Sequence, residues 1–66
     1  MMIVLNGKPA ATPAESTLAD LVTAMQLPGR GIALALDGEV VHRHAWPTTH
    51  LTEQSRVEVV TAMQGG

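Results

Sequence analysis

The first residues have the pattern of a short β-hairpin, two β-rich runs separated by a turn. The run "MIVLNGKPAA" has an apolar stretch on each side of Asn6 and Gly7. These two residue types tolerate the positive φ angles of a tight two-residue turn. In an extended strand, Ile3 and Leu5 would share one face. Pro9 has no N–H to donate, so the second strand is predicted to be short or to lie at a sheet edge.

The stretch "TLADLVTAMQ" changes to the period of an amphipathic helix. Thr17 is suited to cap its N-terminus, and Asp20 lies in the first turn, where the helix dipole favours a negative charge. The following "LPGRG" contains one proline and two glycines, so the helix is expected to stop there. The predicted apolar stripe consists of Leu18, Leu21, Val22 and Met25.

Two further apolar runs predict the remaining strands. "IALALDGEVV" indicates a second hairpin with its turn at Asp37 and Gly38. "RVEVVTAM" indicates a final strand in which Val57 and Val59 share one face. Between the two, "HRHAWPTTHLTEQS" has the composition of a loop, with room for one helical turn before Pro47.

This order of elements, two strands, a helix and three strands, predicts an α+β fold. A single amphipathic helix can bury its stripe only by lying across one face of a sheet. The arrangement is that of the β-grasp (ubiquitin-like) fold, with a mixed sheet of four to five strands in which the final strand runs beside the first. The chain is expected to form one domain over residues 1–66, with 63–66 as a flexible, extended C-terminal tail.

The composition argues against several classes of function. The 66 residues contain no cysteine, so the chain offers no disulfide, no thiolate metal ligand and no cysteine to carry a persulfide. The formal net charge is -2 and the 4 basic residues are scattered, which argues against nucleic-acid binding. No stretch has the pattern of a signal peptide or of a membrane span. A soluble, cytoplasmic protein with no membrane contact is therefore expected.

The last residues, "VTAMQGG", carry the candidate chemistry. Gly65 and Gly66 form a thin tail without side chains, and glycine adopts backbone angles that other residues avoid. A carboxylate is a poor electrophile because it is an anion without a leaving group. Transfer of the Gly66 carboxylate to AMP would supply a leaving group, and a sulfur nucleophile could then attack the carbonyl. A sulfur carrier without thiols would have to hold its sulfur on this carboxyl group.

These stretches together resemble the ThiS family, the sulfur carriers of bacterial thiamine (thiazole) biosynthesis, over essentially the whole chain. The matching positions are "IVLNG", Thr17, Leu21, "ALALDGEVV" with Arg43 and Trp46 after it, Leu51, and "VEVVTAMQGG". Two turns depart from the family pattern. Asp37 stands where Asn is usual, and Gln54-Ser55 stands where Gly-Asp is usual. Both changes keep residue types that turns tolerate.

The resemblance implies a carrier on which other enzymes act, not a catalyst. Proteins of this family are adenylated at the terminal glycine by an E1-like, ThiF-type adenylyltransferase that consumes ATP. The adenylate becomes a thiocarboxylate with sulfur from a donor such as a cysteine desulfurase, and a ThiG-type thiazole synthase receives the sulfur. The resemblance thus implies Gly66 as the attachment site and no bound cofactor. Two alternatives stay open: a carrier for another pathway, such as molybdopterin or cysteine, and a ubiquitin-like modifier or binding module.

Exposed apolar residues next to the tail would mark a docking surface for the partner enzymes. The candidates there are Val60, Ala62 and Met63. Arg43 and Trp46 are two further candidates. Trp46, the only aromatic residue, is expected to close one end of the small core, with a partner anchor as the alternative. Arg43 is equally suited to an acidic group of a partner and to Glu39 across the hairpin.

His42 and His44 flank Arg43 and would face the same way in an extended segment, which is half of a metal site at most. No cysteine or acidic partner completes the set in the sequence. Exposed, titrating histidines and no bound metal are therefore expected.

Overall fold

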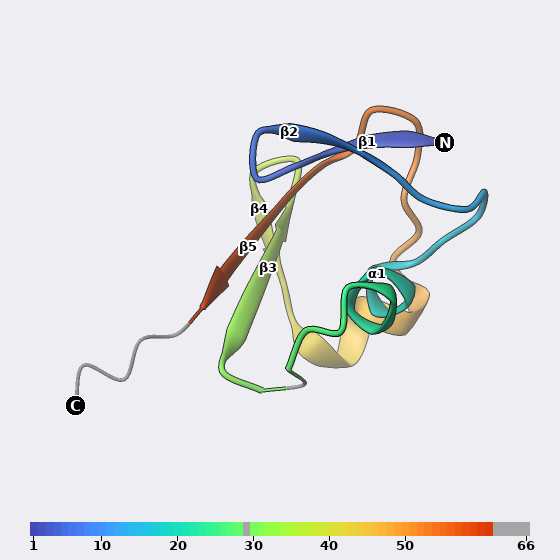
Figure 1. Cartoon of the computed structure of the whole chain (residues 1–66). Helices are drawn as coiled ribbons and strands as arrows, with labels where there is room; N and C mark the ends of the chain where they lie inside the picture. The colour runs from blue at the N-terminus through green and yellow to red at the C-terminus, as the bar shows by residue number, and fades with distance from the viewer. Residues whose placement is uncertain (29, 62–66) are drawn as a thin grey trace.

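The structure is a computed structural model that describes residues 1–28 and 30–61 (Figure 1). Within these ranges the expected order of two strands, a helix and three strands is confirmed, with a 3-10 helix before the last strand. In chain order the elements are β1 (Met2–Leu5), β2 (Lys8–Ala11), α1 (Leu18–Ala24), β3 (Ile32–Leu36), β4 (Glu39–Val41), η1 (Arg43–Thr48) and β5 (Arg56–Thr61).

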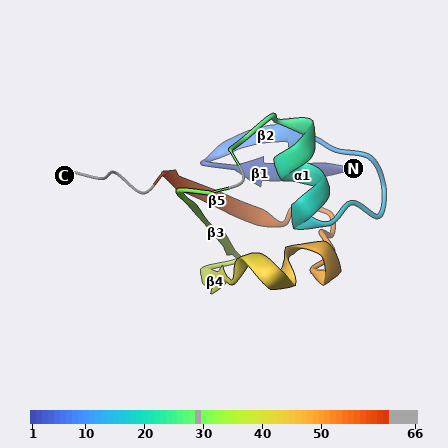
Figure 2. The ribbon, with the colours of Figure 1, turned by 90° about the horizontal axis from the view of Figure 1, so that it is seen from below.

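The strands form one mixed sheet in the order β2-β1-β5-β3-β4. β5 runs parallel to β1 and antiparallel to β3, as predicted for a final strand placed beside the first. β2 lies at the sheet edge, where the missing N–H of Pro9 costs no ladder hydrogen bond. α1 lies across one face of the sheet, and η1 lies beside α1 (Figure 2).

Both hairpins turn on residues with positive φ angles. Asn6 and Gly7 have φ values of 49° and 82°, and Asp37 and Gly38 have values of 51° and 90°. Two successive residues in this region form a type I′ turn, whose twist matches that of the strands it joins. The two predicted hairpins are therefore confirmed, and Asp37 adopts the left-handed conformation that Asn also tolerates.

α1 begins at a capping box. The Thr17 hydroxyl accepts a hydrogen bond from the Asp20 N–H at 3.1 Å, and the Asp20 carboxylate accepts one from the Thr17 N–H at 2.9 Å. These reciprocal bonds satisfy two backbone donors that the helix itself leaves unpaired. The helix is 7 residues long. No helix in the described part of the chain is long and apolar enough to cross a membrane.

The helix ends earlier than the "LPGRG" stretch predicts. Its last residue is Ala24, and Gln26 takes the left-handed conformation with a φ of 57°. The N–H groups of Gln26 and Leu27 donate to the carbonyls of Thr23 and Val22 at 3.1 and 3.0 Å. This pair of bonds is a Schellman motif, which closes a helix C-terminus. The helix stop therefore depends on Gln26, ahead of the glycines, of which Gly29 lies outside the described residues.

The hydrophobic core lies between the sheet and the layer of α1 and η1. Met25 was expected to complete the helix stripe, but its side chain is 42% exposed. That prediction is wrong. Met25 keeps helical backbone angles as the C-cap of α1, but it lies at the end of the helix beside the small side chains of Ala10 and Ala24, which leave it open to solvent. The buried apolar side chains of the core are Ile3, Leu18, Leu21, Val22, Leu34, Trp46, Leu51 and Val57.

The segment between β4 and β5 is more regular than the predicted loop. η1 contains Pro47, whereas the sequence predicted a helical turn only before it. A short 3-10 segment accommodates the proline because only one backbone donor is lost. Trp46 is 5% exposed, and its indole N–H donates to the Val41 carbonyl at 3.0 Å. The ring therefore packs into the core with its polar end satisfied, as the packing interpretation expects.

The turn before β5 accommodates Gln54 and Ser55, the second departure from the family pattern. Gln54 has a φ of 69°, the conformation that glycine adopts most easily. The buried Ser55 hydroxyl accepts a hydrogen bond from the Thr52 N–H at 2.9 Å, a role that an Asp carboxylate also fills. The Gln54 N–H donates to the Met2 carbonyl at 2.7 Å, which ties this turn to the start of β1.

Candidate functional site

The predicted attachment site follows the central strand of the sheet. β5 is third of the five strands and ends at Thr61, which pairs with Ile32 of β3. The structure therefore bears on the candidate site through β5 and the surfaces beside it. The predicted tail 63–66 and the candidates close to it lie outside the described residues, namely Ala62, Met63, Gly65 and Gly66.

β5 continues past its parallel neighbour. The register pairs Val4 with Arg56 and Leu5 with Val57, and β1 ends at that point. On the other edge β5 stays paired with β3 as far as Thr61. Beyond Val57, β3 is therefore the sole strand partner of β5 in the described sheet, and the strand leads away from the rest of the fold (Figure 1).

Two turn side chains hold β5 from its two sides. Asn6 Oδ1 accepts a hydrogen bond from the Val59 N–H at 2.8 Å, just beyond the end of β1. Asp37 Oδ1 accepts one from the Arg56 N–H at 2.9 Å, at the start of β5. The Asp37 N–H donates back to the Arg56 carbonyl at 2.7 Å. Both hairpin turns thus fix the register of the strand that precedes the tail.

The sheet face opposite α1 carries exposed apolar side chains. Successive residues of a strand point to opposite faces, so the buried Leu34 leaves Ala33 on the uncovered side. Val60 is the cross-strand partner of Ala33, and its side chain is 60% exposed. On β4, Val40 pairs with Ala35 and is 70% exposed. We call this surface the bare face, and it consists of Ala33, Ala35, Val40 and Val60.

The bare face is apolar with charges of both signs beside it. Arg56 and Glu58 are exposed and alternate with Val57 and Val59 along β5, so they lie on the same face as Val60. Adjoining exposed apolar side chains of this kind commonly mark a contact with another molecule. The expected exposure of Val60 is confirmed, and its role in docking stays a prediction.

The structure does not bring Arg43 and Trp46 together with Val60. Both belong to η1, which lies with α1 on the covered side of the sheet (Figure 2). Arg43 is exposed, whereas Trp46 offers little surface to a partner because it is buried. A shallow depression of about 270 Å³ there is lined by Ala19, Val22, Thr23, Arg43, Trp46 and Pro47.

His42 and His44, two of the three histidines, stack on each other. The rings of His42 and His44 are nearly parallel at 9°, with centroids 5.7 Å apart. In-plane nitrogen lone pairs of parallel rings do not converge on one ion. Within residues 1–28 and 30–61, no group of three or more His, Cys, Asp or Glu side chains is placed to hold a metal ion.

Sequence reasoning missed most of the bare face. A signal was present, because Val40 and Val41 are consecutive and one of them must point away from the core in a strand. Asn6 and Asp37 were recognised only for their turn conformations. Their hydrogen bonds to β5 depend on where each turn lies beside that strand, which the local pattern does not encode.

Comparison with known proteins agrees with the geometry. The model of the ThiS family matches residues 3–66. The crystal structure of the thiamine biosynthesis protein (ThiS) from Geobacter metallireducens is 28% identical, with 100% of both chains covered and a TM-score of 0.87. The NMR solution structure of a thiamine biosynthesis protein from the same organism is 28% identical, covering 100% of this chain and 88% of that one, with a TM-score of 0.81.

A comparison with curated proteins gave no match. The family match nevertheless spans almost the whole chain, and the five-stranded mixed sheet with one helix in the described part is the β-grasp arrangement expected from the sequence. On these grounds the chain belongs to the ThiS family.

Proposed function

We propose that this chain is a sulfur carrier of thiamine biosynthesis and that it holds sulfur as a thiocarboxylate on Gly66. The observation that carries the proposal is the family match over residues 3–66, which includes both terminal glycines. The bare face supports it, because a carrier needs a surface by which the enzymes that process its terminus can hold it.

The proposed first step activates the terminal carboxylate. An oxygen of the Gly66 carboxylate attacks the α-phosphorus of ATP, which forms an acyl-adenylate and releases pyrophosphate. A persulfide of the sulfur donor then attacks the acyl carbon, and AMP leaves with the electron pair of the C–O bond. The resulting acyl disulfide is cleaved by a thiol, which leaves the thiocarboxylate on Gly66 and a disulfide between the thiol and the donor. The absence of a Cβ on Gly66 keeps the carbonyl accessible in both attacks.

In this proposal the chain is a protein substrate and its partners do the catalysis. An E1-like, ThiF-type adenylyltransferase binds the ATP, a cysteine desulfurase or similar donor supplies the sulfur, and a ThiG-type thiazole synthase receives it. The carrier itself binds no cofactor. Five residues, 62–66, span at most about 18 Å if fully extended.

The test is an intact-mass measurement after incubation with a ThiF-type enzyme, ATP and a sulfur source. We expect a product heavier by the difference between one sulfur and one oxygen atom, with the change located on Gly66 by fragmentation. A variant that lacks Gly66 should keep the fold and show no mass change. A variant with one residue added after Gly66 should behave the same way, because its terminal carboxylate has moved.

Two results would contradict the proposal. An unchanged mass, with no adenylate trapped when the sulfur source is omitted, would mean that the terminus is not activated. Equal product from the variant without Gly66 would mean that the sulfur is held elsewhere. An isopeptide conjugate to lysine in place of the thiocarboxylate would indicate a ubiquitin-like modifier.

A further inference from the structure

A hollow lies on the helix side of the sheet, where β2 and the segment 12–16 meet α1. Its volume is about 530 Å³, within the range of pockets that bind ligands. We call it the β2–α1 groove. Its apolar lining includes Leu5, Ala10, Leu21, Ala24 and Met25.

The groove exists because small side chains meet at this corner of the fold. Ala10 on β2 and Ala24 in the last turn of α1 are too short to fill the space between the strand and the helix. Met25 stands at the end of the helix and remains 42% exposed. The layer that is tightly filled over Ile3 and Leu34 is therefore open at the β2 edge.

The rim of the groove is acidic. Glu15 and Asp20 both line it, and among residues 1–28 and 30–61 no lysine, arginine or histidine does. Asp20 uses Oδ2 to accept the hydrogen bond from the Thr17 N–H in the capping box. Two carboxylates without a basic neighbour in the lining favour an occupant that brings a positive charge.

The wall of the groove also contains a polar side chain without a hydrogen-bond partner in the described part of the chain. The Thr12 hydroxyl is buried, and it makes no hydrogen bond with any described residue. Thr12 lies in the lining between Ala11 and Pro13. Because the hydroxyl has no accessible surface, the recognition features that the groove offers an occupant are its apolar lining and its acidic rim.

From these features we propose that the β2–α1 groove is a docking site for a segment of a partner protein. The segment inserts apolar side chains between β2 and α1 and places a lysine or arginine beside Glu15 and Asp20. The groove and the bare face lie on opposite faces of the sheet, so both can be occupied at once. The inference does not rest on the proposed sulfur-carrier function.

The proposal is tested by titrating the ¹⁵N-labelled full chain with an amphipathic helical peptide of leucine and lysine, followed by NMR. We expect amide shifts at the groove, for example at Ala10, Thr12 and Ala24. A matched peptide with glutamine in place of lysine should bind more weakly by about fivefold or more at low salt, because the charge contribution is lost.

Three variants separate charge, shape and general effects. Glu15→Lys should weaken binding of the lysine peptide by about fivefold, whereas Glu39→Lys, the same change at the opposite sheet edge, should leave it within about twofold. Ala24→Leu should weaken binding of both peptides because it fills the groove. The spectrum of each free variant checks that its fold is intact.

The proposal is overturned if the shifts fall on Val40 and Val60, since the peptide would then prefer the bare face. Equal affinity for the lysine and glutamine peptides, or equal effects of Glu15→Lys and Glu39→Lys, would mean that the acidic rim does not contribute to binding, which contradicts the proposal. No amide shift at millimolar peptide would remove the groove altogether.

Discussion

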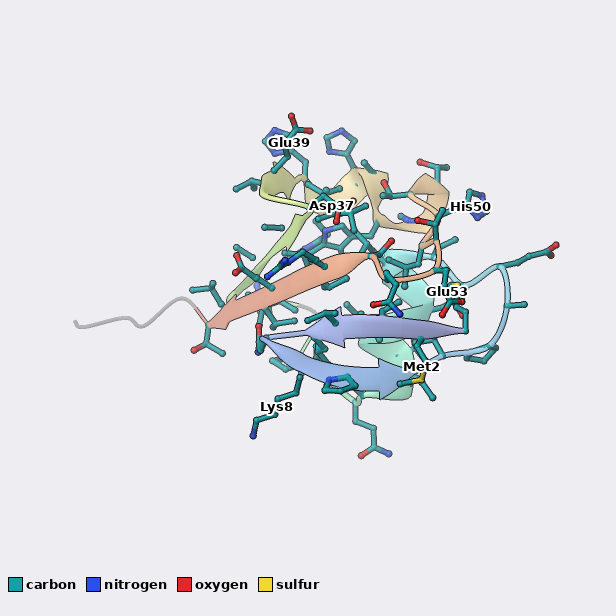
Figure 3. The ribbon with its side chains drawn as sticks, turned by 90° about the horizontal axis from the view of Figure 1, so that it is seen from above. Met2, Lys8, Asp37, Glu39, His50 and Glu53 are labelled. Carbon is teal, nitrogen blue, oxygen red and sulfur yellow. The ribbon has the colours of Figure 1, made fainter. Side chains whose placement is uncertain are left out.

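The two faces of the sheet are built from the same alternating strands and differ in what covers them. On the covered face Ile3, Leu34 and Val57 are each 1% exposed. On the bare face Val40 and Val60 stay 70% and 60% exposed (Figure 3 looks onto this face, with α1 behind the sheet). A single 7-residue helix and a short 3-10 helix can cover only one face, so apolar residues on the other contribute little to the core.

Because of this difference, the covered face stabilises the fold, whereas the bare face is available for binding. An apolar side chain that leaves water on folding stabilises the fold by roughly 1.5–3 kcal/mol, whereas one that stays exposed contributes only a small part of that. If a partner covered Val40 and Val60, the transfer free energy of their side chains would contribute to binding. Substitutions on the covered face should therefore lower the free energy of unfolding more than the same kind of substitution on the bare face.

Leu34→Ala should have the largest effect. Leu34 is 1% exposed at the centre of the covered face, so truncation loses its transfer free energy and leaves a cavity. The free energy of unfolding should fall by about 2–5 kcal/mol, measured by urea denaturation. In a domain of this size, such a loss would leave little net stability.

The matched change on the bare face is Val40→Ala. Val40 is 70% exposed on the same sheet, so the loss should stay below about 1 kcal/mol, mostly from β-propensity. Comparable losses from Leu34→Ala and Val40→Ala would mean that both faces stabilise the isolated fold, and the division drawn above would be wrong.

Asn6→Ala should have an intermediate effect on stability. Asn6 lies in the turn between β1 and β2 and belongs to neither face of the sheet. It removes the acceptor for the Val59 N–H, and it places alanine at a φ of 49°. The expected loss is about 1–2 kcal/mol in the free energy of unfolding. Hydrogen exchange at the Val59 amide should accelerate more than at other β5 amides.

Asn6→Asp is the control, since Asp tolerates the same conformation and keeps an Oδ1 acceptor. It should cost less than half as much as Asn6→Ala. If the two variants lose equal stability and exchange equally at Val59, the side-chain bond does not hold β5, and the turn conformation alone explains the effect.

Local patterns predicted the elements of the fold well, because each is specified by nearby residues. The Asn-Gly and Asp-Gly pairs carry the two hairpins, and the capping residue Thr17 marks the start of α1. The helix end was less predictable, since Gln26 is not a typical left-handed residue. Met25 keeps helical backbone angles, but it stays exposed because nothing large packs against it at the open β2 edge of the sheet.

The candidate site was predicted less completely. Val60 was named for its place in the chain, but the bare face also needs Ala33 and Val40, which join it only through the pairing of β3 with β5 and β4. Arg43 and Trp46 were further docking candidates, as a basic residue and as the only aromatic one, and the fold places them on the covered side. Long-range register determines both outcomes, and a local pattern does not contain it.

Gln54→Gly should have a smaller effect, in the stabilising direction. Gln54 has a φ of 69° in the turn before β5, where glycine avoids the clash of Cβ with the backbone. The gain is partly offset by the greater entropy of glycine in the unfolded chain, so a net increase of up to about 1 kcal/mol in the free energy of unfolding is expected. Gln54→Ala is the matched control and should not stabilise, and a gain as large as that of glycine would contradict the explanation by backbone strain.

Val60→Thr should have the smallest effect on stability and the clearest effect on recognition. Threonine keeps the branched shape that suits a strand, and Val60 is 60% exposed, so the free energy of unfolding should change by less than about 0.5 kcal/mol. If a partner covers this position, the buried hydroxyl should lower affinity for a ThiF-type enzyme by about three- to tenfold, measured by calorimetry. Val40→Thr makes the same change on β4. If only Val60→Thr lowers the affinity, the enzyme docks at the end of β5. If both variants lower it, the contact extends across the bare face. If neither does, the activating enzyme does not bind this face.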